Sequence, residues 1–240
     1  MTTDAGVRLA SGARLVAFDV VDSTNAEARR FAERGEPMPV WLMAARQTAG
    51  RGRHGRNWVS DPGNLFVSLL LDCDAPPRTA GQVSFVAALA VVDTLHPLLP
   101  DATVQIKWPN DVLVDGRKIA GILLESHAAG AGQVRALIVG IGVNLASAPP
   151  DTAFPATCLA QIIGGAAPSP RALTDRLDGH FFARYGVWTR DGFDPVRDAW
   201  LAAAAGRGEN ITARTAQSTV TGRFETISSD GARVWRLPSC

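Results

Sequence analysis

The sequence has few of the residues that build disulfide frameworks, metal clusters or membrane spans. Its 240 residues include three cysteines, which lie far apart at positions 73, 158 and 240. Because no C-x-x-C pair occurs, they predict neither a zinc cluster nor a disulfide framework, and a reducing cytoplasm suits them. The four histidines are scattered without H-E-x-x-H spacing. No apolar stretch reaches the length of a signal-peptide core or a membrane span, so the sequence predicts a cytoplasmic protein without membrane contact.

An excess of charge of one sign is also missing. Lys and Arg together number 24 and Asp and Glu 23, for a net charge of +1. Broad binding to nucleic acid usually needs a clustered basic face, so DNA is not an expected partner. Hydrophobic content of 46% and charged content of 20% are typical of a soluble globular protein. The length suits one sizeable domain with a small second one.

The most informative stretch that is present is QTAGRGRHGRNW at 47–58, which places three arginines between three glycines. Glycine lets backbone N–H groups approach a ligand closely, and arginine presents a planar fork of donors to phosphate or carboxylate oxygens. The stretch therefore predicts a bound anion, with a nucleotide phosphate as the leading candidate. A solvated basic loop and a nucleic-acid contact are the alternatives that these residues alone leave open.

Two familiar phosphate motifs fail at this loop. Gly50, Gly52 and Gly55 fit G-x-G-x-x-G, but that fingerprint must open a helix, and Pro62-Gly63 prevents one. The Walker A spacing fails because Arg56-Asn57 stand where Lys-Ser/Thr is required. The loop is therefore expected to join two strands, and its charge comes from arginine side chains rather than from a helix dipole.

The hydrophobic pattern predicts a chain of mixed strands and helices. Strands are expected over 14–21, 40–45, 65–71, 103–108, 112–114, 118–124 and 134–143, and helices over 24–35, 81–96, 171–187 and 194–205. A Thr24–Glu27 capping box opens the first helix, and Asp115-Gly116 predicts a tight hairpin. Residues 148–170 are expected to be loop.

The alanine run at 202–205, followed by Gly206-Arg207-Gly208, marks a predicted domain boundary. A main domain over 1–205 is expected to precede a small β domain over 206–240, with strands at 211–214, 220–227 and 232–237. About 35 residues are too few for a large core, so this domain is expected to pack on the first.

A second chemical stretch is Lys107-Trp108-Pro109-Asn110-Asp111, which places a cation at a strand end before a turn. Lys107 could neutralise a carboxylate or phosphate, and Asp111 could hold hydrated Mg²⁺. Lys118 could contact phosphate or be a hairpin surface residue. The glycines of GIGVN at 140–144 either relieve crowding or open space for a ligand. Residues 22–25, DSTN, either cap a helix or line a pocket.

In combination these stretches resemble those of one family, the biotin protein ligases, also called biotin–[acetyl-CoA-carboxylase] ligases. The matching pieces are DSTN at 22–25, QTAGRGRHGRNW at 47–58, KWPND at 107–111, RKIAGILLE at 117–125 and GIGVN at 140–144. They occur in the family's order, and GRFETISSDG at 222–231 resembles its small C-terminal β domain. Two departures stand out: His54 replaces a common arginine, and the chain ends early at Cys240.

The resemblance implies an α+β fold, with a class II tRNA synthetase-like catalytic domain on a mixed, mainly antiparallel sheet and an SH3-like C-terminal domain. It also implies the following roles. Biotin and adenylate contacts fall on Ser23, Thr24, Asn25, Gln47, Arg51, Gly52, Arg53, Lys107 and Gly121; ATP contacts fall on Arg51, Arg53, Trp58, Asn110, Lys118 and Asn144. Catalytic roles fall on Arg53, Lys107 and Lys118, and Mg²⁺ on Asp111.

The implied activity uses ATP, biotin and Mg²⁺. Biotin carboxylate attacks the α-phosphorus of ATP to give biotinyl-5′-AMP, and a lysine of a biotin carboxyl carrier protein then takes the biotinyl group. Only about 20 residues precede Asp22, which implies the monofunctional type without a DNA-binding domain. A homodimer is compatible with the family. The rival readings are a lipoate or other acyl-group ligase on the same fold and a non-catalytic regulator that senses biotinyl-AMP.

Overall fold

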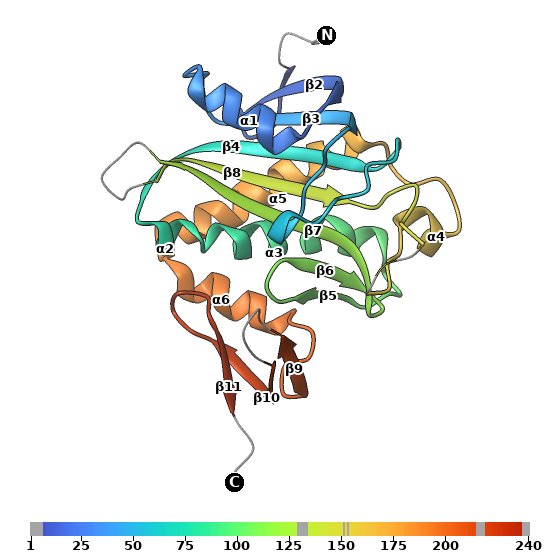
Figure 1. Cartoon of the computed structure of the whole chain (residues 1–240), viewed down its shortest axis with the longest axis vertical. Helices are drawn as coiled ribbons and strands as arrows, with labels where there is room; N and C mark the ends of the chain where they lie inside the picture. The colour runs from blue at the N-terminus through green and yellow to red at the C-terminus, as the bar shows by residue number, and fades with distance from the viewer. Residues whose placement is uncertain (1–6, 129–133, 151, 153, 215–218, 237–240) are drawn as a thin grey trace.

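A mixed eight-stranded sheet organises the main part of the molecule (Figure 1). A computed structural model describes residues 7–128, 134–150, 152, 154–214 and 219–236. In these residues the strand order is β1-β2-β3-β4-β8-β7-β6-β5, with β2 and β3 parallel and the other neighbours antiparallel. The strands are β1 Val7–Arg8, β2 Arg14–Val21, β3 Val40–Gln47, β4 Leu65–Ala75, β5 Val104–Lys107, β6 Asp111–Val114, β7 Arg117–Ala128 and β8 Val134–Val143. The predicted α+β class with a mixed, mainly antiparallel sheet is confirmed.

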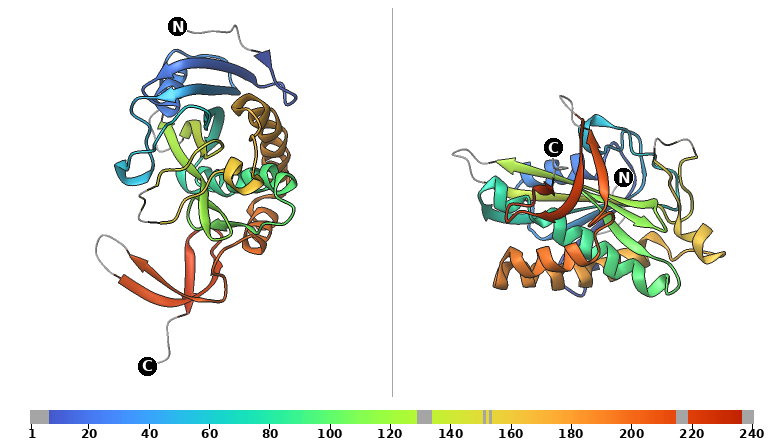
Figure 2. Two further views of the ribbon diagram at one scale, coloured as in Figure 1. Left: turned by 90° about the vertical axis from the view of Figure 1, so that its right-hand side faces the viewer. Right: turned by 90° about the horizontal axis from the view of Figure 1, so that it is seen from below.

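The helices lie on both faces of the sheet, which explains why β4 and β8 read as nearly continuous apolar runs. The helices are α1 Thr24–Glu33, α2 Pro77–Ala80, α3 Val83–Leu95, α4 Leu159–Ile163, α5 Pro170–Asp191 and α6 Phe193–Ala202. One face, with α3, α5 and α6, holds the large core around Trp41, Phe181 and Trp200. The opposite face has a smaller core under α1, which includes Phe31 and Leu70. Figure 2 (left) shows the loop before β4 on the side of the sheet away from α3 and α5.

Three sequence predictions about these helices are wrong. The N-cap of α1 is Ser23, not Thr24, and no side-chain capping bond forms, so there is no capping box. The short helix α4 interrupts the expected loop at 148–170. The expectation that no apolar stretch reaches the length of a membrane span is the third. Pro77–Leu98 forms a helical run that is long and apolar enough to cross a membrane, although 56% of its most apolar window is buried in the protein. Its apolar residues serve the core, because α3 lies against the sheet, α5 and α6.

The C-terminal segment forms a second, three-stranded antiparallel sheet in the order β11-β10-β9. Its strands are β9 Asn210–Arg214, β10 Thr219–Ile227 and β11 Arg233–Arg236, close to the predicted ones. Phe224 and Ile227 of β10 are fully buried as part of the large core. This C-terminal sheet therefore packs on the main domain, at the bottom of Figure 1.

Candidate functional site

Three glycines, Gly121, Gly140 and Gly142, lie close together on the α1 face of the large sheet where β7 and β8 pair. Gly121 of β7 lies opposite Gly142 of β8, and Leu123 lies opposite Gly140. The indole of Trp58 lies on the first of these pairs: a Cβ added to Gly142 would be 2.6 Å from Trp58 Cε2, and one added to Gly121 would be 2.9 Å from Cζ3. Any larger residue at either position would displace the indole. The glycines therefore form a floor that admits a flat group.

Lys107 and Asp111, two of the predicted site residues, lie in the same cross-strand row as the glycines of the floor. The register pairs Gly121 with Asp111 of β6, and Asp111 with Lys107 of β5. Directly opposed residues project from the same face of a sheet, so Lys107 and Asp111 lie beside the glycines. Lys118 Nζ lies 2.6 Å from Asp111 Oδ1 and 5.2 Å from the centroid of the Trp58 ring. Three predicted site residues, Lys107, Asp111 and Lys118, thus meet at one edge of the floor.

Lys107 is a partly buried cation of this site, and its pKa is lowered. Burial lowers the pKa of its ammonium group; the Asp111 carboxylate opposes the shift, while Lys118 and Arg233 add to it. Its Nζ lies 3.2 Å from the centroid of the Phe154 ring, a cation–π contact. The segment with Phe154 is held against the start of β7, because Lys118 N–H donates to Pro155 O at 2.8 Å. No pattern in the sequence indicated Phe154, which lies in a stretch predicted only as loop.

A polar cluster lies at the N-terminus of α1, next to the end of β3. Gln47 Oε1 accepts hydrogen bonds from the Thr24 N–H (2.8 Å) and from Thr24 Oγ1 (3.2 Å), while Gln47 Nε2 donates to Ser60 Oγ (3.1 Å). Ser23 is buried, and its side chain makes no capping bond. Thr24 and Gln47 thus bring a hydroxyl and an amide group together, directly after the buried Ser23 in the chain. The roles that the resemblance implies for these residues stay a prediction.

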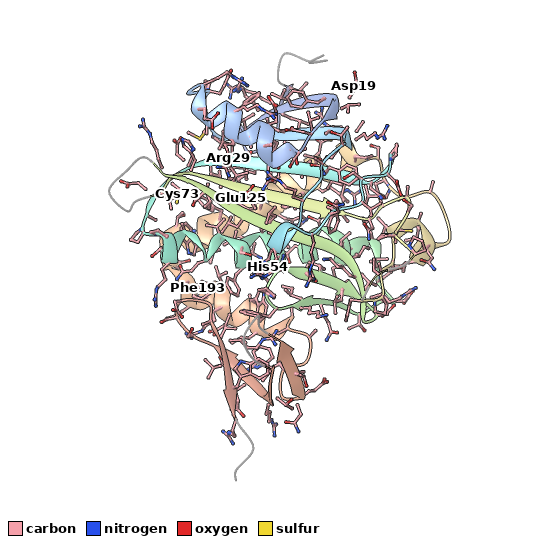
Figure 3. All side chains as sticks on the ribbon, viewed as in Figure 1. Asp19, Arg29, His54, Cys73, Glu125 and Phe193 are labelled. Carbon is pink, nitrogen blue, oxygen red and sulfur yellow. The ribbon has the colours of Figure 1, made fainter. Side chains whose placement is uncertain are left out.

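Asn25 lies one residue further along α1 and is engaged with the protein itself. Its Nδ2 donates to Glu125 Oε2 at 2.8 Å, and its Oδ1 lies 2.6 Å from Ser68 Oγ. Gly140 permits this position, because a Cβ there would lie 2.1 Å from Asn25 Oδ1. Figure 3 shows Glu125 beside Arg29, with which it also forms an ion pair of 3.5 Å. Asn25 therefore fixes α1 on the sheet beside the polar cluster.

Ser68 and Glu125 are site residues that the sequence reasoning missed. Ser68 is fully buried, and its hydroxyl also lies 2.8 Å from Thr24 Oγ1. A signal was present, because a single hydroxyl interrupts the apolar run LFVSLLL and a buried hydroxyl needs a partner. Glu125 ends the matched stretch RKIAGILLE, but nothing in its spacing points to Asn25.

The arginine-rich loop is a small hairpin rather than an irregular loop. Gly52 N–H donates to Arg56 O at 2.7 Å, and Trp58 N–H donates to Gly50 O at 3.0 Å. At the tip, Arg56 N–H donates to Arg53 O, and the central residues His54 and Gly55 have φ of 57° and 70°. Positive φ at both central positions defines the type I′ turn of tight hairpins. We call residues 47–58 the lid; Figure 3 shows His54 at its tip.

Beside the lid tip a cavity of about 220 Å³ opens at the edge of β7. It is lined by Arg53, Gly81, Ser84, Phe85, Trp108, Pro109, Asn110, Ile122, Leu123, Leu124 and Gly231. Asn110 is fixed at this edge by two bonds to β7: its Nδ2 donates to Ile122 O at 2.7 Å, and its carbonyl accepts the Ile122 N–H at 2.9 Å. The cavity thus adjoins Leu123 of the floor and two predicted ATP contacts, Arg53 and Asn110.

The remaining predicted residues occupy two distinct settings. Asn144 is buried at the end of β8, and its Nδ2 donates to Thr157 O at 3.1 Å, so it supports the segment that carries Phe154. Arg51 and Arg53 are exposed on the lid, and the described residues contain no ion pair to either. Within the described part of the chain no cluster of three His, Cys, Asp or Glu side chains could hold a metal ion. Asp111 is the carboxylate nearest the cations, and Lys118 already neutralises it.

The fold and the site together define a class: an α+β domain whose sheet joins a glycine floor, a polar cluster and several cations on one face, suited to an anionic ligand with a flat ring. The chain belongs to the Biotin/lipoate A/B protein ligase family, which residues 17–144 match.

Particular relatives narrow this class. The chain is 46% identical to the biotin–[acetyl-CoA-carboxylase] ligase of Paracoccus denitrificans over 223 residues, which cover 91% of this chain and 92% of that protein. Its structure is similar to that of the Aquifex aeolicus biotin protein ligase in complex with biotin and ATP, with a TM-score of 0.78 at 27% identity, covering 92% and 90% of the two chains. It is also similar to the Leishmania major enzyme in complex with biotinyl-5-AMP, with a TM-score of 0.64 at 27% identity, covering 85% and 91%.

Proposed function

We propose that this protein is a biotin protein ligase that forms biotinyl-5′-AMP from biotin and ATP and transfers the biotinyl group to a lysine of a carrier protein. One observation carries the proposal: Lys107, Lys118 and Trp58 of the lid border a glycine floor, and Gly140 of that floor contacts Asn25, next to the polar cluster of Ser23, Thr24 and Gln47. A biotin–[acetyl-CoA-carboxylase] ligase is 46% identical over nearly the full length of the chain.

The first step joins two anions, the biotin carboxylate and the α-phosphate, so it needs fixed positive charge. Lys107 and Lys118 border the floor, and Arg51 and Arg53 are on the lid above it. Their task is positioning and charge stabilisation, as in phosphoryl transfer generally. No protein nucleophile is needed.

The polar cluster of Ser23, Thr24 and Gln47 suits the ureido ring of biotin. A ureido group has one carbonyl acceptor and two N–H donors, and Ser23, Thr24 and Gln47 supply hydroxyl and amide groups of both kinds. Thr24 and Gln47 bond to each other in this structure, so a bound ureido group would exchange those contacts for its own. The Ser23 hydroxyl is free of a capping role.

The lid can protect the adenylate between the two steps. Biotinyl-5′-AMP is a mixed anhydride that water hydrolyses, and closing a loop over such an intermediate excludes water. The hairpin geometry of the lid and the Trp58 ring on the glycine floor suit this role. Trp58 Nε1 is buried without a partner among the described residues, so it has a donor to offer.

We assign Mg²⁺ to the ATP rather than to a protein cage. Mg²⁺ usually keeps several waters and binds through one or two carboxylates plus substrate phosphates. Asp111 is the one carboxylate beside the cations, and its contact with Lys118 leaves it a weak ligand on its own. Mg²⁺ therefore enters as part of the substrate MgATP. Asp111, which pairs with Lys118, would be at most an additional ligand of that ion.

The acceptor is, on this proposal, the biotin carboxyl carrier protein of an acetyl-CoA carboxylase, in line with the relative's name. The use of ATP agrees with the cytoplasmic location that the sequence predicts. Homodimer formation stays a prediction, as does the assignment of individual residues to biotin or ATP.

One experiment separates the proposal from a lipoate ligase and from a non-catalytic sensor. The protein is incubated with MgATP, an acceptor carrier domain and either biotin or lipoate, and pyrophosphate release and acceptor mass are measured. We expect both signals with biotin alone. Signals with lipoate alone would identify the lipoate ligase, and tight biotinyl-AMP binding without acceptor modification would identify the sensor.

A further inference from the structure

Arg233, the first residue of β11, occupies an unusual position for a cation. Its guanidinium carbon lies 4.6 Å from the centroid of the Trp108 ring, 5.1 Å from that of Phe224 and 5.0 Å from that of Trp235. Among the described residues no carboxylate lies within ion-pair distance of it, and its Nε is buried without a partner. Burial lowers the pKa of this guanidinium. Arg233 therefore interacts with its neighbours through cation–π contacts and hydrogen bonds rather than through an ion pair.

The contact that Arg233 makes is with Trp108, the residue after Lys107. Arg233 Nη2 donates to Trp108 O at 3.2 Å, while the guanidinium lies over the indole ring. The same indole is held at its other end, because Trp108 Nε1 donates to Gly231 O at 3.2 Å. Both the backbone and the side chain of Trp108 are therefore fixed by the C-terminal sheet.

The C-terminal turn that supplies these groups is itself anchored on the main domain. Arg78 forms an ion pair of 2.6 Å with Asp230, and Gln82 Nε2 donates to Ser229 O at 3.0 Å. Gly231 lies so close to Phe85 of α3 that a Cβ there would be 2.6 Å from Cε2. The turn is thus a fixed support, not a surface that slides over the domain.

The other side of the β5–β6 turn is held by β7 through the two Asn110–Ile122 bonds. The turn with Lys107 at its start is therefore clamped between β7 and the C-terminal sheet. We propose that Arg233 is a positioning residue for adenylation, which acts through Trp108 to hold Lys107 in place at the glycine floor. This inference rests on the proposed ligase function and extends it to a residue outside every matched motif.

The test compares variants by single-turnover pyrophosphate release with biotin and MgATP, with rates expressed per active site. Arg233→Met keeps the stem and removes the planar cation; we expect about a tenfold lower rate with an unchanged KM for the acceptor. Arg233→Lys, which keeps the charge but not the planar fork, should be intermediate. The matched control is Arg236→Met, because Arg236 lies on the same strand but is exposed and pairs with Glu225.

A double-mutant cycle checks the route through Trp108. In a Trp108→Ala background, Arg233→Met should lower the rate by less than a further twofold. The proposal is overturned if Arg233→Met matches Arg236→Met, if the two substitutions act independently, or if Arg233→Met lowers only the melting temperature at an unchanged rate per active site. If Arg233→Met does not fold, the Arg233→Lys variant provides the test. A wild-type rate of pyrophosphate release in Arg233→Lys would then reject the positioning role of Arg233. Wild-type turnover with biotin tests the ligase function itself, so failure of one claim is distinct from failure of the other.

Discussion

At the scale of single residues, both the position and the charge of Lys107 support a role in adenylation. It begins the row of Lys107, Asp111, Gly121 and Gly142 across four strands, and Phe154 covers its ammonium group. Lys107→Ala removes the cation that faces the reacting anions. We expect adenylation to slow by roughly 10²-fold, comparable to the loss of one oxyanion donor. Near-normal pyrophosphate release would exclude a direct role for this lysine.

The same residue predicts a pH dependence. Burial lowers the pKa of Lys107, so its charged form, present below that pKa, is lost at a lower pH than for an ordinary lysine. The adenylation rate should therefore fall on the alkaline side as pH rises through this lowered pKa. Lys107→Arg stays protonated and should move the alkaline limb to higher pH, whereas Lys118→Arg should leave it in place. An identical limb in both variants would assign it to another group.

Arg53 is expected to act on the product of the first step. It lies next to the lid tip and lines the cavity at the edge of β7. Arg53→Ala should still bind biotin but release biotinyl-5′-AMP about tenfold faster, since a charge-assisted hydrogen bond to phosphate is lost. A quenched single-turnover assay measures the retained adenylate. Arg56→Ala on the same hairpin is the control, and equal retention in both variants would remove Arg53 from the site.

At the scale of elements, the lid gains its shape from His54-Gly55. A non-glycine residue with positive φ costs free energy, and histidine tolerates this conformation better than most, while a β-branched residue does not. His54→Val should therefore destabilise the hairpin by roughly 1–2 kcal/mol and shorten the lifetime of the bound adenylate severalfold. His54→Asn should keep it, because asparagine suits a type I′ turn. Wild-type retention in His54→Val would show that the closed lid does not use this turn.

The elements themselves were largely predictable because their signals are local. Alternation and apolar runs placed β2, β4 and β8, and Asp115-Gly116 placed the β6–β7 hairpin. The capping of the N-terminus of α1 and the presence of α4 were predicted wrongly, because capping and short helices depend on tertiary contacts. Gln47, for example, supplies the acceptor for the Thr24 N–H that a capping box would have provided.

The site divides in the same way between local and long-range information. The lid, Lys107, Lys118 and the Ser23–Thr24–Gln47 set could be read from motifs. Phe154, Ser68 and Arg233 could not, because each reaches the site across the fold: Phe154 through a bridge to β7, Ser68 through Thr24, and Arg233 through Trp108. Their roles depend on the register of strands that no local pattern fixes.

At the scale of the whole molecule, the two sheets are joined more closely than a boundary at 205/206 suggests. Ile106 of β5 accepts the Ala205 N–H at 2.9 Å and donates its own N–H to Ala203 O at 2.8 Å. The linker is thus bonded to the strand that carries Lys107. The domain boundary stays a prediction, and the C-terminal sheet supports the β5–β6 turn that begins at Lys107.

A buried carboxylate on the opposite side of the sheet ties the N-terminal segment, β3 and α5 together. Asp178 of α5 is fully buried and accepts hydrogen bonds from Ser11 N–H (3.0 Å), Ser11 Oγ (2.6 Å) and Trp41 Nε1 (2.9 Å). Asp178→Ala leaves the indole N–H of the buried Trp41 without an acceptor, and an unsatisfied buried donor costs about 1–3 kcal/mol. It also removes the two contacts to Ser11, which is exposed.

We expect Asp178→Ala to lower the free energy of unfolding by about 3 kcal/mol and the melting temperature by roughly 6–12 °C for a chain of this size. Calorimetry or circular dichroism measures both, and adenylation per folded molecule should be unchanged because Asp178 does not contact the site. Asp175→Ala is the matched control, since Asp175 lies one turn away on α5 and forms an exposed pair with Arg171; it should shift stability by less than about 0.5 kcal/mol. Equal melting temperatures for the two variants would mean that the N-terminal segment and β3 are held on α5 by apolar packing alone.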